Sequence, residues 1–170
     1  MSPVFGFYKT VNDSPALSLA IDNAFQEAER LNHAFIGCEH LLLGVMLLSK
    51  DVANRLLNSR RIGVRQLRRA TKLLISRGPP LTNKESLPLT HRAQNAIEYA
   101  ETIACVRNER LDVDHLFIGI VNQRESVAVQ ILLTMGIGMQ ELENVVANYR
   151  NENITGSQRD ARDVGLTFVN

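Results

Sequence analysis

Apolar residues along this chain recur at steps of three and four, which is the spacing of an amphipathic helix that lies on a core. One such stripe consists of Leu17, Ala20, Ile21, Ala24, Phe25, Ala28 and Leu31. A matching stripe in the second half consists of Ala93, Ala96, Ile97, Ala100 and Ala104. Ser14, which precedes Pro15, and Thr90 lie where a helix N-cap hydroxyl is expected. The pattern therefore predicts a long helix after each of these two residues.

The two stripes belong to a longer internal repeat. The segment from His40 to Val45 (HLLLGV) recurs from His115 to Ile120 (HLFIGI). The register then continues, because Ala53, Leu56, Leu57, Ile62, Gly63 and Leu67 correspond to Ala128, Ile131, Leu132, Ile137, Gly138 and Leu142. Ordered matches through a whole unit indicate a duplication rather than a chance motif.

Each unit is predicted to contain four helices. After the long first helix we expect second helices over 38–48 and 112–122, short third helices around 52–57 and 127–132, and fourth helices over 64–76 and 139–149. Glycine at 63 and at 136–138 is expected to supply the left-handed turn before the fourth helix. Aromatic residues are only 5% of the chain and Trp is absent, which also favours helices over sheets. The predicted fold is all-α, a pseudo-twofold duplicated four-helix repeat of about eight helices.

Breaks in the helical pattern give the domain organisation. Residues 77–88 contain three of the five prolines and a glycine, so they are predicted to link the units. We expect an N-terminal extension at 1–13, the first repeat at 14–76, the second at 89–149, and a flexible polar tail at 150–170.

Charge and cysteine usage restrict the possible partners. The 19 Lys and Arg residues nearly balance the 18 Asp and Glu residues, so the net charge does not indicate nucleic acid or a membrane surface as a partner. A basic stretch at 60–72 and an acidic region near Glu141 could steer a protein partner or could be solvated helix faces. Cys38 and Cys105 lack metal-ligand spacing, which predicts free thiols in a reducing compartment and no metal or cofactor. No apolar run reaches the ~20 residues of a membrane span, and the start lacks a secretory signal, so we expect an intracellular protein.

The segment 32–44 (NHAFIGCEHLLLG) resembles the signature of the Clp N-terminal repeat, and the segment 89–93 (LTHRA) resembles the start of the second repeat of that domain family. The resemblance covers residues 14–149, and the second copy departs from the family pattern at 110–114. It implies an all-helical module that docks adaptors and substrates for ClpA- and ClpC-like unfoldases, or, as in the ClpT accessory proteins, associates with the Clp protease core. No G-x-x-x-x-G-K-[ST] phosphate loop occurs in the chain, so we expect no ATPase. No motif combines a nucleophile, a base and an orienting group, so we expect no other enzyme either.

Three other functions stay open at this point. The chain could be a structural accessory that stabilises the Clp protease ring, or the N-domain part of a ClpC-like ATPase. A nucleic-acid binder that uses the basic fourth helix is the alternative from another class, and we expect no such binding. We also expect a monomer, located in the bacterial cytoplasm or the plastid stroma.

Two acid–histidine neighbours, Glu39-His40 and Asp114-His115, are the candidate site residues. Neighbours on a helix point about 100° apart, so a catalytic or metal role for either pair is disfavoured. We expect His40 and His115 to begin the central helices with a ring nitrogen bonded to nearby backbone.

The resemblance implies that the two acids, Glu39 and Asp114, recognise phosphorylated arginine on a bound protein through its guanidinium group. The threonine that precedes the acid in the family is Cys38 in the first copy and Val113 in the second, so each site lacks a hydroxyl. The alternative is that both acids favour the positive helix N-terminus.

Overall fold

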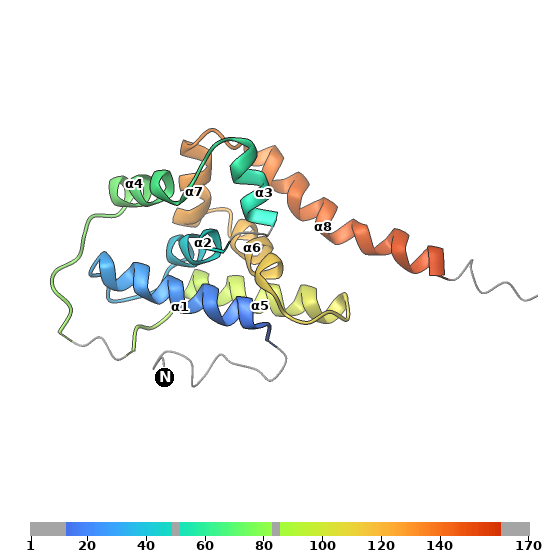
Figure 1. Cartoon of the computed structure of the whole chain (residues 1–170), viewed down its shortest axis with the longest axis horizontal. Helices are drawn as coiled ribbons and strands as arrows, with labels where there is room; N and C mark the ends of the chain where they lie inside the picture. The colour runs from blue at the N-terminus through green and yellow to red at the C-terminus, as the bar shows by residue number, and fades with distance from the viewer. Residues whose placement is uncertain (1–12, 49–51, 83–85, 161–170) are drawn as a thin grey trace, which may run out of the picture.

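The computed structural model describes residues 13–48, 52–82 and 86–160, with the backbone alone for 152–160. Within these ranges the chain forms eight helices and no strand, which confirms the all-α prediction (Figure 1). The helices are α1 (Pro15–Arg30), α2 (Cys38–Met46), α3 (Val52–Ser59), α4 (Val64–Leu74), α5 (His91–Val106), α6 (Val113–Asn122), α7 (Val127–Thr134) and α8 (Met139–Asp160).

The first helix of each repeat begins at the predicted cap. The Ser14 hydroxyl accepts a hydrogen bond from the Leu17 N–H at 3.0 Å, and the Thr90 hydroxyl accepts one from the Ala93 N–H at 3.2 Å. Just past the other end of each helix, Asn32 and Asn108 adopt the left-handed conformation, with φ of 55° and 52°. Asparagine tolerates this conformation better than most residues, so the matching ends follow from sequence.

Helices α2 and α6 form the centre of the molecule. Every residue of α2 is buried, and α1 and α5 cover α2 and α6 respectively. At each crossing a glycine faces the backbone of the covering helix. A Cβ on Gly44 would overlap the Ala20 carbonyl oxygen, and one on Gly119 would overlap that of Ala96. Glycine at these two positions therefore sets how closely the paired helices approach.

Backbone hydrogen bonds join the start of each repeat to the other repeat. The Ser14 N–H donates to the Leu111 carbonyl at 2.9 Å. In the mirrored position, the Ile36 N–H donates to the Pro88 carbonyl at 2.8 Å, and the Thr90 N–H donates to the Ile36 carbonyl at 2.9 Å. The segment before each first helix is thus paired with the loop before the central helix of the other repeat, so the two repeats interlock.

Some predicted boundaries differ from the structure. Helix α8 continues to Asp160, past the predicted end at Tyr149, and projects from the helical body (Figure 1). Polar residues other than Gly and Pro have adequate helix propensity, so polar composition alone does not end a helix. The remaining expectations for 1–12 and 161–170 lie outside the described residues.

A left-handed residue precedes the fourth helix in both repeats, but it is the predicted glycine only in the second repeat. Gly136 adopts it, with φ of 87°, but in the first repeat Arg61 adopts it, with φ of 57°. Gly63, at φ of −111°, is instead the N-cap of α4, so the prediction for Gly63 was wrong. The glycine lies two residues too late to end α3.

No single helix in the described part of the chain is both long and apolar enough to cross a membrane, and only α6 with α7, bent by 87°, meets that length and composition as a pair. In the same ranges, no group of three or more His, Cys, Asp or Glu side chains could hold a metal ion.

The glycine crossings lead to a prediction about stability. Alanine is ordinarily more stable than glycine inside a helix by roughly 1 kcal/mol. At Gly44 or Gly119 we expect the opposite, a loss of about 1–3 kcal/mol in the free energy of unfolding, because the added methyl must push two backbones apart. Urea denaturation of Gly44→Ala and Gly119→Ala measures this change.

Gly138→Ser is the matched control. A Cβ there meets nothing within 4 Å, and serine is a good residue for a helix start. This variant is expected to keep the wild-type stability or to gain slightly. Stabilisation by alanine at position 44 or 119 would contradict the close crossing.

Candidate functional site

The two candidate carboxylates lie in the first turns of the central helices but have different surroundings. Glu39 is 4% exposed, and its carboxylate lies over Gly37, where a Cβ would overlap it. Burial raises the pKa of Glu39 above its ordinary value. Asp114 is half-buried, and its Oδ1 accepts a hydrogen bond of 2.7 Å from the Val52 N–H, the first residue of α3. The acid of the second repeat therefore stabilises a helix start in the first repeat.

These placements bear on the predicted recognition of phosphorylated arginine. A guanidinium group binds a carboxylate most strongly when both oxygens are free to accept parallel hydrogen bonds. At Asp114 an incoming guanidinium competes with Val52, and at Glu39 it must reach a side chain that is almost wholly covered. Recognition of phosphorylated arginine stays a prediction. It would require displacing the Val52 hydrogen bond at Asp114 and uncovering the buried Glu39.

His40 is a buried, neutral residue in a directed chain of hydrogen bonds. The Gly37 N–H donates to its Nδ1 at 2.9 Å, so the ring proton must lie on Nε2. That nitrogen is 2.8 Å from Nδ1 of His33, whose Nε2 is 3.0 Å from the Ser76 carbonyl oxygen. The only consistent arrangement has His40 donating to His33 and His33 donating to Ser76. The two imidazoles thus tie α2 to the segment after α4.

Protonation of His40 would break this chain. Burial is the main cause that lowers the pKa of His40 to about 3, and the neighbouring His33 adds to it. Glu39 Oε1 is 3.3 Å from His40 Nδ1, but this contact is not an ion pair, because that nitrogen already accepts the Gly37 hydrogen bond and the ring is neutral. The structure places His40 at the start of α2, with a backbone partner and a fully buried side chain.

His115 occupies the equivalent place in the second repeat with a different partner. The Asp112 N–H donates to its Nδ1 at 3.1 Å, and its Nε2 is 3.0 Å from Oε2 of Glu109. Glu109 also accepts a hydrogen bond from Arg107 Nε at 2.8 Å. Glu109 thus takes the place that His33 has in the first repeat, and it also binds Arg107.

Sequence reasoning missed a buried ion pair between α1 and α4. Glu27 is 3% exposed and accepts hydrogen bonds from Arg68, including one of 3.1 Å from Nε, and from Arg30 at 2.6 Å. Burial alone would raise the pKa of Glu27, but the hydrogen bonds from Arg68 and then Arg30 outweigh it and hold the pKa below its ordinary value. The available signal was an acid on the apolar stripe of the first helix. His33 and Glu109 gave no such signal, because each lies in a loop.

Both cysteines are free, but their surroundings differ. Cys38 is 2% exposed, and burial raises the pKa of its thiol to about 12, so it behaves as a small apolar residue at the start of α2. Cys105 lies exposed on α5.

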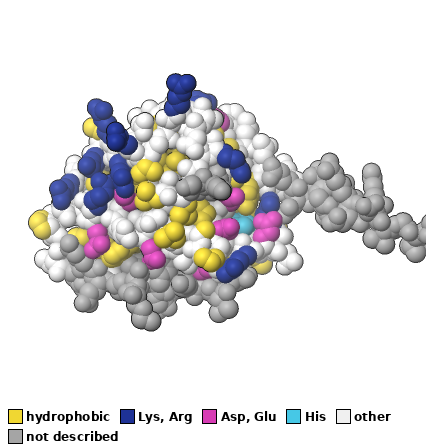
Figure 2. All heavy atoms as spheres, viewed as in Figure 1, with side chains coloured by type: hydrophobic (Ala, Val, Ile, Leu, Met, Phe, Trp, Pro, Cys, Tyr) yellow, Lys and Arg dark blue, Asp and Glu magenta, His cyan; other side chains and the backbone are white. Residues whose placement is uncertain are grey.

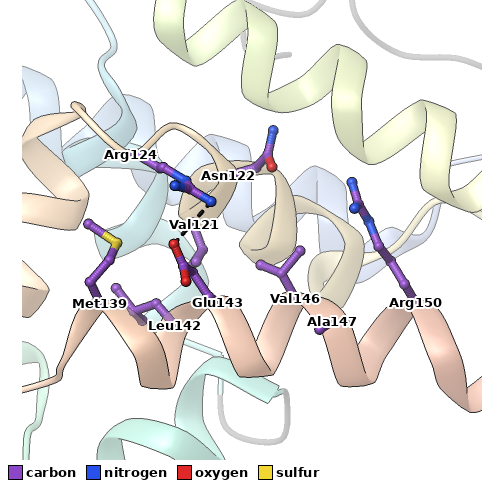
Figure 3. A pocket seen from close by; sticks show the side chains of 9 residues that line it. All are labelled: Val121, Asn122, Arg124, Met139, Leu142, Glu143, Val146, Ala147 and Arg150. Atoms are coloured by element: carbon purple, nitrogen blue, oxygen red, sulfur yellow. Dashed lines mark ion pairs between the residues drawn. The ribbon is translucent and has the colours of Figure 1, made fainter.

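A shallow pocket lies between the end of α6 and α8 (Figure 3). Its apolar floor includes Val121, Leu142 and Val146, and Arg124 and Glu143 form an ion pair of 3.0 Å at its rim. The Arg124 side chain is 67% exposed and that of Glu143 is 36% exposed, so the pair is solvated and closes the pocket only weakly. None of the predicted site residues lines it.

Comparison with known proteins identifies the family to which the chain belongs. The model of the Clp repeat (R) N-terminal domain matches residues 14–105 and 88–167. A probable ATP-dependent Clp protease ATP-binding subunit of Chlamydia pneumoniae is 33% identical over 72% of this chain and 15% of its own length. The negative regulator of genetic competence ClpC/MecB of Bacillus subtilis is 27% identical over 79% of this chain and 16% of its own length. The chain therefore spans less than a fifth of these relatives.

Two solved structures share the fold. The N-terminal domain of the Caseinolytic protease associated chaperone ClpD from Arabidopsis thaliana has a TM-score of 0.68 and 17% identity, covering 84% of this chain and 97% of that one. A chain from structural work on a malarial protein secretion system has a TM-score of 0.63 and 16% identity, covering 85% of this chain and 98% of that one. At these identities the likeness shows the fold alone.

The histidine chain predicts a loss of stability in mild acid. The ordinary pKa of an unfolded histidine is about 6.5, and the pKa of His40 in the folded protein is about 3. Below about pH 6.5 the unfolded chain takes up a proton that the folded protein does not, so stability present above that pH is lost as the pH falls. At about pH 5 this one group should cost roughly 2 kcal/mol.

Urea denaturation of the wild type and of His40→Asn, at about pH 7.5 and about pH 5, isolates this contribution. The Asn side chain keeps an oxygen that can accept the Gly37 hydrogen bond but does not titrate. We expect the variant to be less stable at both pH values and to lose clearly less stability on acidification. Equal losses in the two proteins would show that His40 does not carry the effect.

Proposed function

Because this chain belongs to the Clp repeat N-terminal domain family, we propose that it is a non-catalytic protein-interaction module of a Clp unfoldase–protease system. Its partners are adaptors, substrates, or the Clp ATPase or protease core. Its action is equilibrium binding, and it needs no cofactor, metal, membrane or nucleic acid.

One structural observation carries the proposal beyond family membership. The polar side chains at the starts of the central helices α2 and α6 are used inside the protein: His40 bonds to His33, His115 to Glu109, and Asp114 to Val52. A catalytic site needs a nucleophile, a base and an orienting group that converge on a space open to substrate. Groups that hold helices together favour a scaffold, which presents its outer surface to partners.

The relatives support a second candidate within the same system. Those from Chlamydia pneumoniae and Bacillus subtilis are several times longer than this chain, and the former is named an ATP-binding subunit. The second candidate is therefore that this fold acts as the N-terminal domain of a ClpC-like ATPase. A structural accessory of the protease ring would use the same outer surface. In each case we propose a bacterial cytoplasmic or plastid stromal location and a monomeric domain.

Affinity capture tests the proposal. The tagged chain is incubated with native extract of the source organism, and bound proteins are quantified by mass spectrometry. We expect enrichment of Clp ATPase or Clp protease subunits over a control capture with the tag alone. A parallel sample without residues 150–170 assigns any contact made by the C-terminal segment.

Recovery of unrelated proteins without any Clp subunit would contradict the Clp-system assignment. The repeat would then be a scaffold used for a different partner.

A further inference from the structure

The charges of this nearly neutral chain are strongly separated. Residues 52–84 contain nine of the 19 Lys and Arg residues and none of the 18 Asp and Glu residues. The rest of the chain therefore carries a clear excess of acid. The basic segment contains α3, α4 and the start of the linker, and Lys and Arg side chains gather over the α4 side of the molecule (Figure 2).

Helix α4 turns one face to the core and a cationic face outward. Leu67 and Thr71 are buried, and Arg68 is held by Glu27 on α1. Three further cations, Arg65, Arg69 and Lys72, are exposed, and none of them has an ion pair or hydrogen bond to a described residue. The inner contacts fix the helix, so the outer cations are presented on a rigid surface.

Two features make this face more than a solvated row of charges. Arg65, Arg69 and Leu73 follow one another at four-residue steps, which places them in a row along the helix. Leu73 is 80% exposed and Leu74 is 45% exposed at the end of that row. An apolar anchor beside three cations that no described acid neutralises is complementary to an acidic, amphipathic polypeptide.

We propose that the outer face of α4, formed by Arg65, Arg69, Lys72 and Leu73, docks an acidic helical segment of a partner protein. The inference rests on the proposed function and names the surface and the partner chemistry. Glu or Asp side chains one helical turn apart on the partner accept bidentate hydrogen bonds from Arg65 and Arg69, and an apolar side chain covers Leu73.

A polypeptide fits this face better than a nucleic acid. Binding of single strands relies on aromatic side chains that stack with bases, and residues 60–77 contain no aromatic residue. A phosphate backbone also gives Leu73 nothing apolar to contact. The charge pattern explains orientation and fast association, and the leucine explains why the site selects protein.

Fluorescence anisotropy with a labelled synthetic peptide tests the proposal. The probe is a helical peptide with Glu at every fourth position and a Leu one turn after the last Glu. We expect saturable binding to the full chain that weakens with salt. Arg65→Glu with Arg69→Glu should raise the Kd about tenfold or more, and Leu73→Ser should raise it several-fold.

The matched control is Arg92→Glu with Arg124→Glu. It makes the same change in net charge at two exposed arginines of the second repeat, whose surface ion pairs contribute little to stability. We expect its Kd to stay near the wild-type value. Equal weakening by both double variants, or no saturable binding, would overturn the assignment of the site to α4. Tighter binding of an oligothymidine strand than of the peptide would overturn the polypeptide assignment.

Repeating the affinity capture with Arg65→Glu and Arg69→Glu separates the two proposals. Failure of peptide binding while Clp subunits are still recovered would contradict only the α4 site. Failure to recover Clp subunits with the wild type would contradict the proposed function itself.

Discussion

Close contact between helix backbones at two glycines is the constraint on which this structure depends. Gly44 and Gly119 let α2 and α6 lie directly against the carbonyl groups of α1 and α5. Alanines on the covering helices complete the crossings, with Ala24 and Ala100 next to the two glycines. Because α2 and α6 are at the centre, each of the other described helices packs against one of them. The duplication has kept glycine at both positions while other core residues differ, such as Leu42 in place of Phe117.

The interlocked repeats explain how polar residues near the core are satisfied. Hydrogen bonds from Ser14 and Thr90 pass between repeats, and Asp114 of the second repeat supports α3 of the first. The same geometry accepts different chemistry in the two copies, a histidine pair around His40 and a histidine–glutamate pair at His115. The histidine pair gives the first repeat a pH-dependent link through His40. Because the polar groups near the core are used inside the protein, we propose that partners bind to the exterior, above all to α4.

Most of the fold could be predicted from the sequence, because helix positions depend on local patterns of residues. Apolar spacing, the caps at Ser14 and Thr90, and the internal repeat correctly indicated the all-α class and the start of each long helix. Contacts between distant segments were not predictable in this way. The Glu27–Arg68 pair and the His33–His40 bond depend on the approach of separate elements, which no spacing rule encodes. The end of α8 was missed for a different reason, since the polar composition after residue 150 was taken as the end of the helix, although polar residues can continue one.

Native-state hydrogen exchange at low urea concentrations tests the interlocked fold most directly. If the two repeats form one cooperative unit, the amides of α2 and α6, together with those of Ile36 and Thr90, should merge into a single opening reaction whose free energy equals that of global unfolding. Exchange of α5 and α6 as a block at a clearly lower free energy than α1 and α2, or the reverse, would contradict the account. The repeats would then be two independent units in simple contact.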